Sequence, residues 1–203
     1  MSHQPRIVVA TGNAHKTEEI AAALARQGCA VTVVSARELG GMPEVDENGN
    51  TFEANARLKV EALQAKAGTS DWILADDSGL EVEVLDGAPG IYSARYAGPN
   101  ATDADNNAKL LRELGCTPSP CRKARFVCTL VLLGGGVDAV FNGVCAGRML
   151  EQAAGNAGFG YDPLFVPDDY EQTFAELGSS VKDEISHRAR ACQQLAGWLN
   201  ARK

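Results

Sequence analysis

Three features that would indicate other classes of protein are missing from this 203-residue chain. There is no long apolar segment and no signal-peptide pattern after Met1, so we expect a cytoplasmic protein with no membrane partner. Positive charge is not in excess: the net charge is -7, which argues against a nucleic-acid partner. The six cysteines form no CxxC pair, which argues against a structural zinc site.

The composition indicates a globular protein of ordinary domain size. Hydrophobic residues make up 45% of the chain, enough to bury a sizeable core. We therefore expect a single domain over residues 1–203, with two lobes flanking a cleft.

The most informative segment is Trp72–Leu80, where an apolar run leads directly into adjacent carboxylates, Asp76 and Asp77, and then Ser78 and Gly79. A near-continuous apolar run is typical of a buried strand, and open α/β sheets bind ligands beyond the carboxyl ends of such strands. Paired carboxylates at that place suit Mg²⁺, which prefers oxygen ligands. The alternative is a simple acidic turn, because Asp, Ser and Gly are turn residues.

A second apolar strand followed by a small polar turn, Arg6–Lys16, ends in a cation. Successive backbone N–H groups in a Gly/Asn turn at the start of a helix form an anion site. Thr11 and Asn13 add side-chain donors there, and Lys16 adds a point charge. An ordinary strand-to-helix connection with a solvated lysine is the alternative.

Two later segments carry further candidate binding residues. Gly155–Pro163 is too rich in glycine for a helix or a regular strand. Its Phe159 and Tyr161 offer flat faces on which a base could stack, although either ring could instead fill the core. Ser180–Arg188 gathers Lys, His and Arg near the start of the last helix, where cations are unfavourable unless an anion binds there too. This favours a clamp for a phosphate or a polar base.

Hydrophobic periodicity predicts the remaining elements. Strands over 126–133 and 137–149 flank three glycines and most simply form a hairpin, so we expect a mixed sheet. Strict alternation over 80–84 predicts a separate strand that turns at Asp86-Gly87. Helices are expected over 17–27, after Thr51, and after Thr102 with Ala104, Ala108, Leu111 and Leu114 facing inward. A last helix is expected to restart at Ser186 after a short break and to carry one apolar stripe, formed by Ile185, Ala189, Cys192, Leu195 and Leu199.

Taken together, these segments resemble the inosine triphosphate pyrophosphatase family, the Ham1-like nucleoside triphosphatases. The resemblance runs almost from end to end. Any one matching segment is weak evidence, whereas six in the family's order are highly specific. The six are Thr11–Lys16, Thr51–Ala56, Ala75–Leu80, Gly87–Tyr96, Gly158–Pro163 and Ile185–Arg188.

The resemblance implies an α/β fold with a mixed, elongated central sheet flanked by helices, and two lobes around a nucleotide cleft. It implies Mg²⁺-dependent hydrolysis of non-standard purine nucleoside triphosphates (ITP, dITP, XTP) to the monophosphate and pyrophosphate, by a homodimer. Because the bulk charge repels polyphosphate, such a site must be locally basic and metal-assisted. The open alternatives are a Maf-like nucleotide pyrophosphatase with another base preference, a phosphoribosyltransferase and a nucleotide-binding protein without turnover.

The resemblance also implies roles for individual residues. Asp77 would be the general base and a Mg²⁺ ligand, and Glu47 would be the second ligand. Glu44 and Asp46 are alternatives to Glu47, because that acidic segment varies. The substrate-binding residues would be Thr11, Gly12, Asn13, Ala14, His15, Lys16, Ser78, Phe159, Gly160, Tyr161, Asp162, Lys182, His187 and Arg188.

Overall fold

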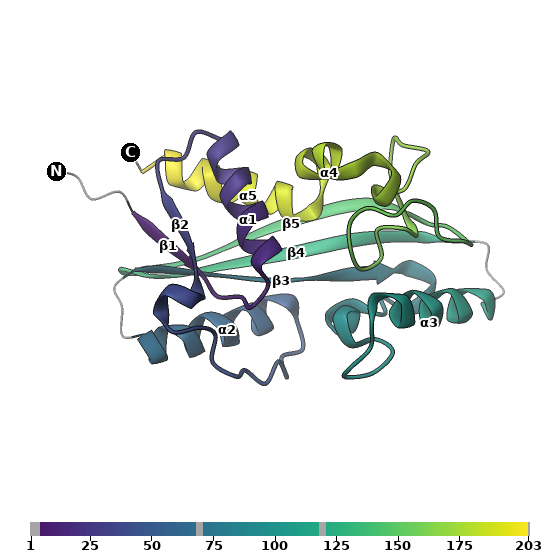
Figure 1. The fold of residues 1–203 in the computed structure, drawn as a ribbon, viewed down its shortest axis with the longest axis horizontal. Coiled ribbons are helices and arrows are strands. Elements are labelled where there is room, and N and C mark those ends of the chain that lie inside the picture. Colours follow the sequence, from purple (N-terminus) through teal and green to yellow (C-terminus); the bar gives the residue numbers. More distant parts are fainter. Residues whose placement is uncertain (1–4, 68–70, 118–120, 203) are drawn as a thin grey trace. The chain divides into compact units, whose positions relative to one another are not determined.

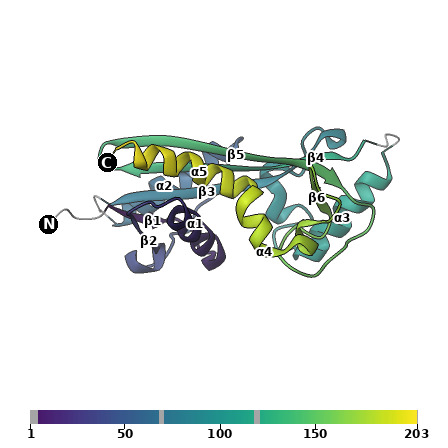
Figure 2. The same ribbon diagram turned by 90° about the horizontal axis from the view of Figure 1, so that it is seen from above.

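The strands form one mixed sheet in the computed structural model, which describes residues 5–67, 71–117 and 121–202. Within these residues the sheet has six strands in the order β2-β1-β3-β4-β5-β6. Figure 1 labels β1 to β5, and Figure 2 labels β6. The pairing of β1 with β2 and β3 is parallel, whereas β5 pairs with β6 antiparallel. The predicted α/β class with a mixed sheet is therefore confirmed. The strands are β1 (Arg6–Val9), β2 (Thr32–Ser35), β3 (Trp72–Val82), β4 (Lys123–Gly134), β5 (Val137–Met149) and β6 (Phe165–Pro167).

The chain divides into two compact units, and each draws on segments that are far apart in the sequence. Strands β3, β4 and β5 contribute residues to both units. The cleft and the single domain over 1–203 stay predictions, and each unit is described by itself. The first unit comprises Met1–Asp77, Cys128–Gly143 and Arg188–Lys203, and the second comprises Ser78–Val127 and Val144–His187.

In the first unit, helices cover both faces of the strands (Figure 1). Helices α1 (Ala14–Arg26) and α5 (His187–Asn200) pack on one face, against Ile7, Val9 and Leu74 among others. Helix α2 (Phe52–Ala67) packs on the other face, against Val8 and Ile73. Figure 2 shows α1 beside β1 and β2. Burial on both faces explains why these strands are nearly continuous apolar runs. The 3₁₀ helix η1 (Ala36–Leu39) follows β2.

The predicted helix boundaries in the first unit are close to those observed. Helix α1 begins at Ala14, three residues before the predicted start, because Asn13 caps it. Helix α1 is followed by Gly28, whose φ of +66° lies in the left-handed region that favours glycine. The Thr51 side chain accepts a hydrogen bond from the Ala54 N–H at 3.1 Å, at the start of α2.

Strand β3 differs from the prediction, because it runs without a break through the two carboxylates. Asp76 to Gly79 therefore lie inside a strand and not in a turn, and the predicted separate strand over 80–84 begins as the continuation of β3. The interior of a sheet accepts these carboxylates because buried cations pair with them, as described below. The 3₁₀ helix η2 (Glu83–Leu85) follows, and the chain turns at Asp86 and Gly87, as predicted.

In the second unit, α3 (Asp103–Gly115) and α4 (Phe174–Ile185) contribute to one core cluster. The predicted inward face of α3 is confirmed for Leu111 and Leu114, which pack in the core, and wrong for Ala104 and Ala108, which are exposed. Asn106 and Leu110 are buried instead. Asn106 turns inward because its amide binds the backbone of Ala94 and Ala97, at the end of the 3₁₀ helix η3 (Gly90–Arg95). Helix α4 lies beside β6 (Figure 2). None of the helices in the described parts of the chain has the length and apolarity needed to cross a bilayer.

The pairing of β5 with β6 requires a glycine at position 147. A Cβ on Gly147 would lie 2.2 Å from the Val166 carbonyl oxygen and 2.7 Å from the Phe165 ring. We expect Gly147→Ala to lower the free energy of unfolding by about 2 kcal/mol, measured by urea titration. Gly197→Ala is the matched control: no atom lies within 4 Å of the added Cβ in α5, and we expect stabilisation by about 0.5–1 kcal/mol. Equal stability of the two variants would contradict this packing.

Candidate active site

Asp76 is a buried carboxylate that binds two cationic side chains in the first unit. Lys16 donates to its Oδ1 at 2.8 Å, and the Nε of Arg188 donates to its Oδ2 at 2.6 Å. The Cys128 thiol lies 3.6 Å from Oδ2. Burial by itself would raise the pKa of Asp76, but the charges of Arg188 and Lys16 hold it well below the usual range. Asp76 is therefore ionised and fully engaged inside the protein.

Asp77, the next residue of β3, has one oxygen engaged and one available. Lys59 of α2 donates to Asp77 Oδ1 at 2.7 Å and to the Asp76 carbonyl oxygen at 3.0 Å. The other oxygen, Oδ2, is buried and has no hydrogen-bond partner among the described residues. Burial raises the pKa of Asp77 above its ordinary value, despite the neighbouring charge of Lys59. This carboxylate can thus accept a proton or bind a cation.

Glu47 reaches the same ammonium group as Asp77. The Lys59 Nζ lies 3.2 Å from Glu47 Oε2, so a single cation contacts both predicted metal ligands. Burial lowers the pKa of Lys59, but the charges of Asp77, Glu47 and Asp76 together raise it by more, so the pKa lies above its ordinary value. In the same acidic segment, Asp46 Oδ2 accepts a hydrogen bond from the Asn48 amide at 3.4 Å. These contacts favour Glu47 as the second carboxylate.

The oxygens of Asp77 and Glu47 fit a hard divalent cation. Mg²⁺ is commonly held by one or two carboxylates together with substrate phosphates, and Asp77 Oδ2 is a buried acceptor with no other ligand in the described part of the chain. A larger set, with three or more His, Cys, Asp or Glu side chains suited to a metal, is not found among the described residues.

The predicted phosphate loop leads from β1 into α1. The Asn13 side chain caps α1 by accepting from the Lys16 N–H at 3.4 Å, and the Asn13 N–H donates to Thr11 Oγ1 at 3.1 Å. Gly12, Asn13 and Ala14 are exposed, and the first turn of α1 contains no acidic residue. This helix end can therefore receive an anion. The His15 side chain is 83% exposed, beside Glu18 at 3.8 Å.

Arg188 is placed differently from the predicted phosphate clamp. Its guanidinium is almost fully buried and contacts two carboxylates, Asp76 through Nε at 2.6 Å and Glu19 through Nη1 at 2.5 Å. These ion pairs raise the pKa of Arg188, although burial alone would lower it. In this arrangement Arg188 supports Asp76, and the structure does not place it facing solvent.

In the second unit, the predicted base loop is arranged around Lys182. The Asp162 carboxylate is buried; it accepts a hydrogen bond from the Phe159 N–H at 2.9 Å and forms an ion pair with Lys182. The Lys182 Nζ lies 4.1 Å from the centroid of the Phe159 ring, within cation–π range. The Phe159 ring is 41% exposed, which leaves area for a ligand. A Cβ on Gly158 would lie 2.1 Å from Asp162 Oδ2, so the close approach of the loop backbone to Asp162 requires glycine at position 158.

The remaining predicted residues of the second unit are less exposed. Tyr161 is only 4% exposed and its hydroxyl donates to the Ser93 carbonyl at 2.9 Å, so its ring fills the core and does not offer a stacking face. His187 is buried and stacks on Phe126, with ring centroids 4.8 Å apart. Ser78 follows Asp77 on β3 and is half-buried.

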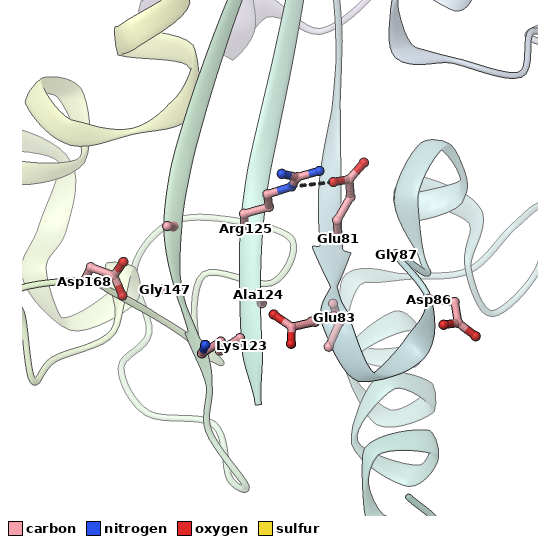
Figure 3. A pocket seen from close by; sticks show the side chains of 11 residues that line it. Glu81, Glu83, Asp86, Gly87, Lys123, Ala124, Arg125, Gly147 and Asp168 are labelled. Atoms are coloured by element: carbon pink, nitrogen blue, oxygen red, sulfur yellow. Dashed lines mark hydrogen bonds and ion pairs between the residues drawn. The ribbon is translucent and has the colours of Figure 1, made fainter. Parts of the chain in front are cut away.

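A cavity of about 620 Å³ in the second unit contains none of the predicted site residues. Figure 3 shows that Arg125 faces Glu81 there, and their side chains form an ion pair at 2.6 Å. Glu83, Asp86 and Lys123 lie at the same surface. Charges of both signs line the cavity, and none of the described residues that line it is aromatic. We assign no chemistry to it.

Lys59 is the main contributor that the sequence did not identify. Its only signal is the i, i+4 spacing from Asn55 on one face of α2, and a polar residue on a helix is usually solvated. Asn55 is buried as well, and its Oδ1 accepts from the Gly49 N–H at 2.9 Å, which ties down the segment that carries Glu47.

Comparison with known proteins identifies close relatives over nearly the whole chain. Residues 7–198 match the model of the Ham1 family. A protein from Opitutus terrae named dITP/XTP pyrophosphatase is 52% identical over 198 residues, covering 95% of this chain and 98% of that protein. One from Desulforamulus reducens with the same name is 46% identical, over 96% of each chain.

Solved structures give the same result. The Ham1 protein of Staphylococcus aureus superposes with a TM-score of 0.86 at 40% identity, covering 98% of this chain and 100% of that one. A HAM1 protein from Coxiella burnetii gives a TM-score of 0.89 at 35% identity, with the same coverage.

The buried Asp76 predicts a large difference between two Asp→Asn variants. Asp76→Asn leaves Lys16 and Arg188 without their buried partner, and we expect it to lower the free energy of unfolding by about 3–5 kcal/mol at pH 7, measured by urea titration. Asp138→Asn is the control, because Asp138 pairs with Arg57 at 3.0 Å but is 60% exposed. We expect it to cost less than about 1 kcal/mol. Equal losses would contradict the account.

The pH dependence of the Asp76 contribution has a defined sign. The folded-state pKa of Asp76 is depressed, so its stabilisation is present above the unfolded pKa of about 4 and is lost as pH falls toward the folded pKa. The stability difference between the wild type and Asp76→Asn should therefore be constant above about pH 5 and narrow below about pH 4. A difference that grows on acidification would contradict the assignment.

Proposed function

Because the chain belongs to the Ham1 family, we propose that it hydrolyses triphosphates of non-standard purines, such as dITP, XTP and ITP, to the nucleoside monophosphate and pyrophosphate. The observation that carries this proposal is the pair of neighbouring aspartates on β3. Both oxygens of Asp76 form ion pairs, and its pKa is lowered. Asp77 has a raised pKa and an oxygen without a partner in the described residues. A carboxylate of the second kind suits a general base.

In the first unit, Asp77 orients a water molecule and accepts its proton as the water oxygen attacks phosphorus. A new P–O bond forms, the P–O bond to the departing pyrophosphate breaks, and the electron pair leaves with pyrophosphate. The family resemblance favours attack at the α-phosphate. Lys16 and the N-terminus of α1 supply the positive potential that holds the phosphates. Lys59 offsets the repulsion between Asp77, Glu47 and the substrate.

Asp77 and Glu47 are the residues that would hold Mg²⁺, since both present oxygens to one place and Asp77 Oδ2 has no other ligand in the described chain. When bound, Mg²⁺ supplies charge neutralisation for the phosphate oxygens. Its requirement is tested directly by turnover after chelation and readdition of the ion.

In the second unit, Phe159 and Lys182 bind the purine base. The Phe159 ring is exposed enough to stack on a base, and Lys182 and Asp162 place hydrogen-bonding groups beside it. A site built around one donor and acceptor pattern rejects a base that leaves its polar groups unpaired. We assign the preference for a 6-oxo purine without a 2-amino group to these contacts. The homodimer and the cytoplasmic location stay predictions from the sequence.

Replacing Asp77 should affect chemistry more than binding. We expect Asp77→Asn to lower kcat for dITP by about 10²–10⁴-fold, because a general base contributes that much, with substrate binding retained. Steady-state kinetics and equilibrium titration measure the two effects. Asp138→Asn makes the same change on the surface of the first unit and should leave both unchanged. Near-normal turnover by Asp77→Asn would refute the assignment.

Replacing Phe159 should have the opposite signature. Loss of base stacking costs about 1–3 kcal/mol, so we expect Phe159→Ala to raise KM for dITP about tenfold while kcat changes little. Tyr92→Ala is the control, because Tyr92 is also an exposed aromatic residue of the second unit, at 55% exposure. An unchanged KM with a collapsed kcat would rule out stacking as the role of Phe159.

A product-resolved assay tests the proposed function as a whole. ITP, dITP, XTP, ATP, GTP and dTTP are offered separately with Mg²⁺, and monophosphate, diphosphate, pyrophosphate and orthophosphate are quantified. We expect monophosphate and pyrophosphate from the inosine and xanthosine nucleotides, with ATP and GTP nearly untouched. Release of orthophosphate, or a preference for a standard nucleotide, would contradict the proposal. Binding without turnover would indicate a nucleotide-binding protein.

A further inference from the structure

Both backbone polar groups of Gly160, in the base loop of the second unit, bind side chains of α3. The Gly160 N–H donates to Asp103 Oδ2 at 2.6 Å. The Gly160 carbonyl accepts from Asn107 Nδ2 at 2.9 Å. Asp103 and Asn107 are four residues apart in α3, so they lie on one face of the helix. We propose that these two α3 residues are positioning residues that set the base affinity and selectivity of the loop, an inference that rests on the proposed function.

The Gly160 peptide determines where the neighbouring aromatic rings point. Its φ of +59° lies in the left-handed region that favours glycine, and nothing lies within 4 Å of an added Cβ. Glycine is therefore needed for its conformation and not for space. On one side the ring of Tyr161 is buried and its hydroxyl is held by Ser93, and on the other side the ring of Phe159 is exposed. The conformation of Gly160 thus fixes the exposed ring relative to the anchored one.

The α3 contacts complete a set of restraints on this loop. Asp162 Oδ2 accepts a hydrogen bond from the Phe159 N–H, which fixes the backbone on the N-terminal side of Phe159. Asp103 lies in the first turn of α3, where the helix dipole favours a carboxylate, and its bond to the Gly160 N–H is charge-assisted. Rigid placement of a stacking ring reduces the entropy lost on binding a base.

The hydrogen bond from Asn107 to Gly160 leaves the other polar atom of the Asn107 amide without a partner in the described part of the chain. This atom, Oδ1, is buried, while Nδ2 binds the Gly160 carbonyl. A buried acceptor without a partner calls for an explanation. The carbonyl of Gly160 requires a donor, which orients the amide with Nδ2 toward the loop.

Helix α3 is anchored independently of the base loop. Thr102 and Asp105 form a capping box at its N-terminus, and Asn106 binds the backbone of Ala94 and Ala97. Because these contacts do not involve Gly160, α3 is the fixed support and the loop is the part that it positions. This arrangement also provides a matched control: Asp105 stabilises the same helix turn without a contact to the loop.

Steady-state kinetics of Asp103→Ala, Asn107→Ala and Asp105→Ala separate positioning from stability. We expect the first two variants to raise KM for dITP about tenfold each, with kcat within about twofold of the wild type, and to lower the preference for dITP over dGTP. Asp103→Asn, which keeps an acceptor, should restore part of the KM. Asp105→Ala should lower the melting temperature about as much as Asp103→Ala does, but it should leave KM unchanged.

Hydrogen exchange of the Gly160 amide gives a second readout, independent of turnover. We expect exchange to be faster in Asp103→Ala and unchanged in Asp105→Ala. Normal KM and normal exchange in Asp103→Ala, or an equal rise in KM in Asp105→Ala, would overturn the inference while leaving the proposed function intact. If the wild type releases no pyrophosphate from dITP although Gly160 is protected, the proposed function fails and the role assigned to α3 fails with it.

Discussion

The site depends on one constraint: charges buried beside β3 must be neutralised inside the protein. Asp76 meets this constraint by binding Lys16 and Arg188, which ties the start of α1 to a residue of α5 through one carboxylate. Asp77 meets it only partly, because Lys59 engages one of its oxygens and the other has no partner in the described residues. Adjacent residues of the same type thus acquire opposite properties, and the less satisfied one is left for chemistry.

The sequence predicted the parts of the fold that local patterns encode. Apolar runs, the helix starts at Thr51 and Thr102, and glycine and aspartate at turns are local signals, and their elements were found near the expected residues. The uninterrupted β3 was not predicted, since Asp-Asp-Ser-Gly has turn composition, and only distant cations make a strand acceptable there. The inward face of α3 was predicted only in part, because Asn106 is buried by hydrogen bonds to the backbone of the segment that precedes the helix.

Prediction of the site was limited in the same way. Motif order identified the family and the segments of the site. It could not distinguish the side chains that face a ligand from the buried side chains that support the site from inside the protein. Arg188 and Tyr161 have partners that place them in the second group, whereas Phe159 and Asp77 remain available. Lys59, Asp103 and Asn107 were missed because each is an ordinary polar helix residue until its contact partner is known.

The most direct measurement of the central claim is a ¹³C NMR titration of the aspartate carboxyl groups in the metal-free protein, assigned with Asp76→Asn and Asp77→Asn. We expect Asp76 to stay ionised well below the ordinary aspartate range and Asp77 to titrate above it, because burial raises the pKa of both and the ion pairs of Asp76 with Lys16 and Arg188 outweigh that effect. Two neighbouring carboxyls that both titrate at the ordinary pKa, or in the reverse order, would contradict the division of roles between them.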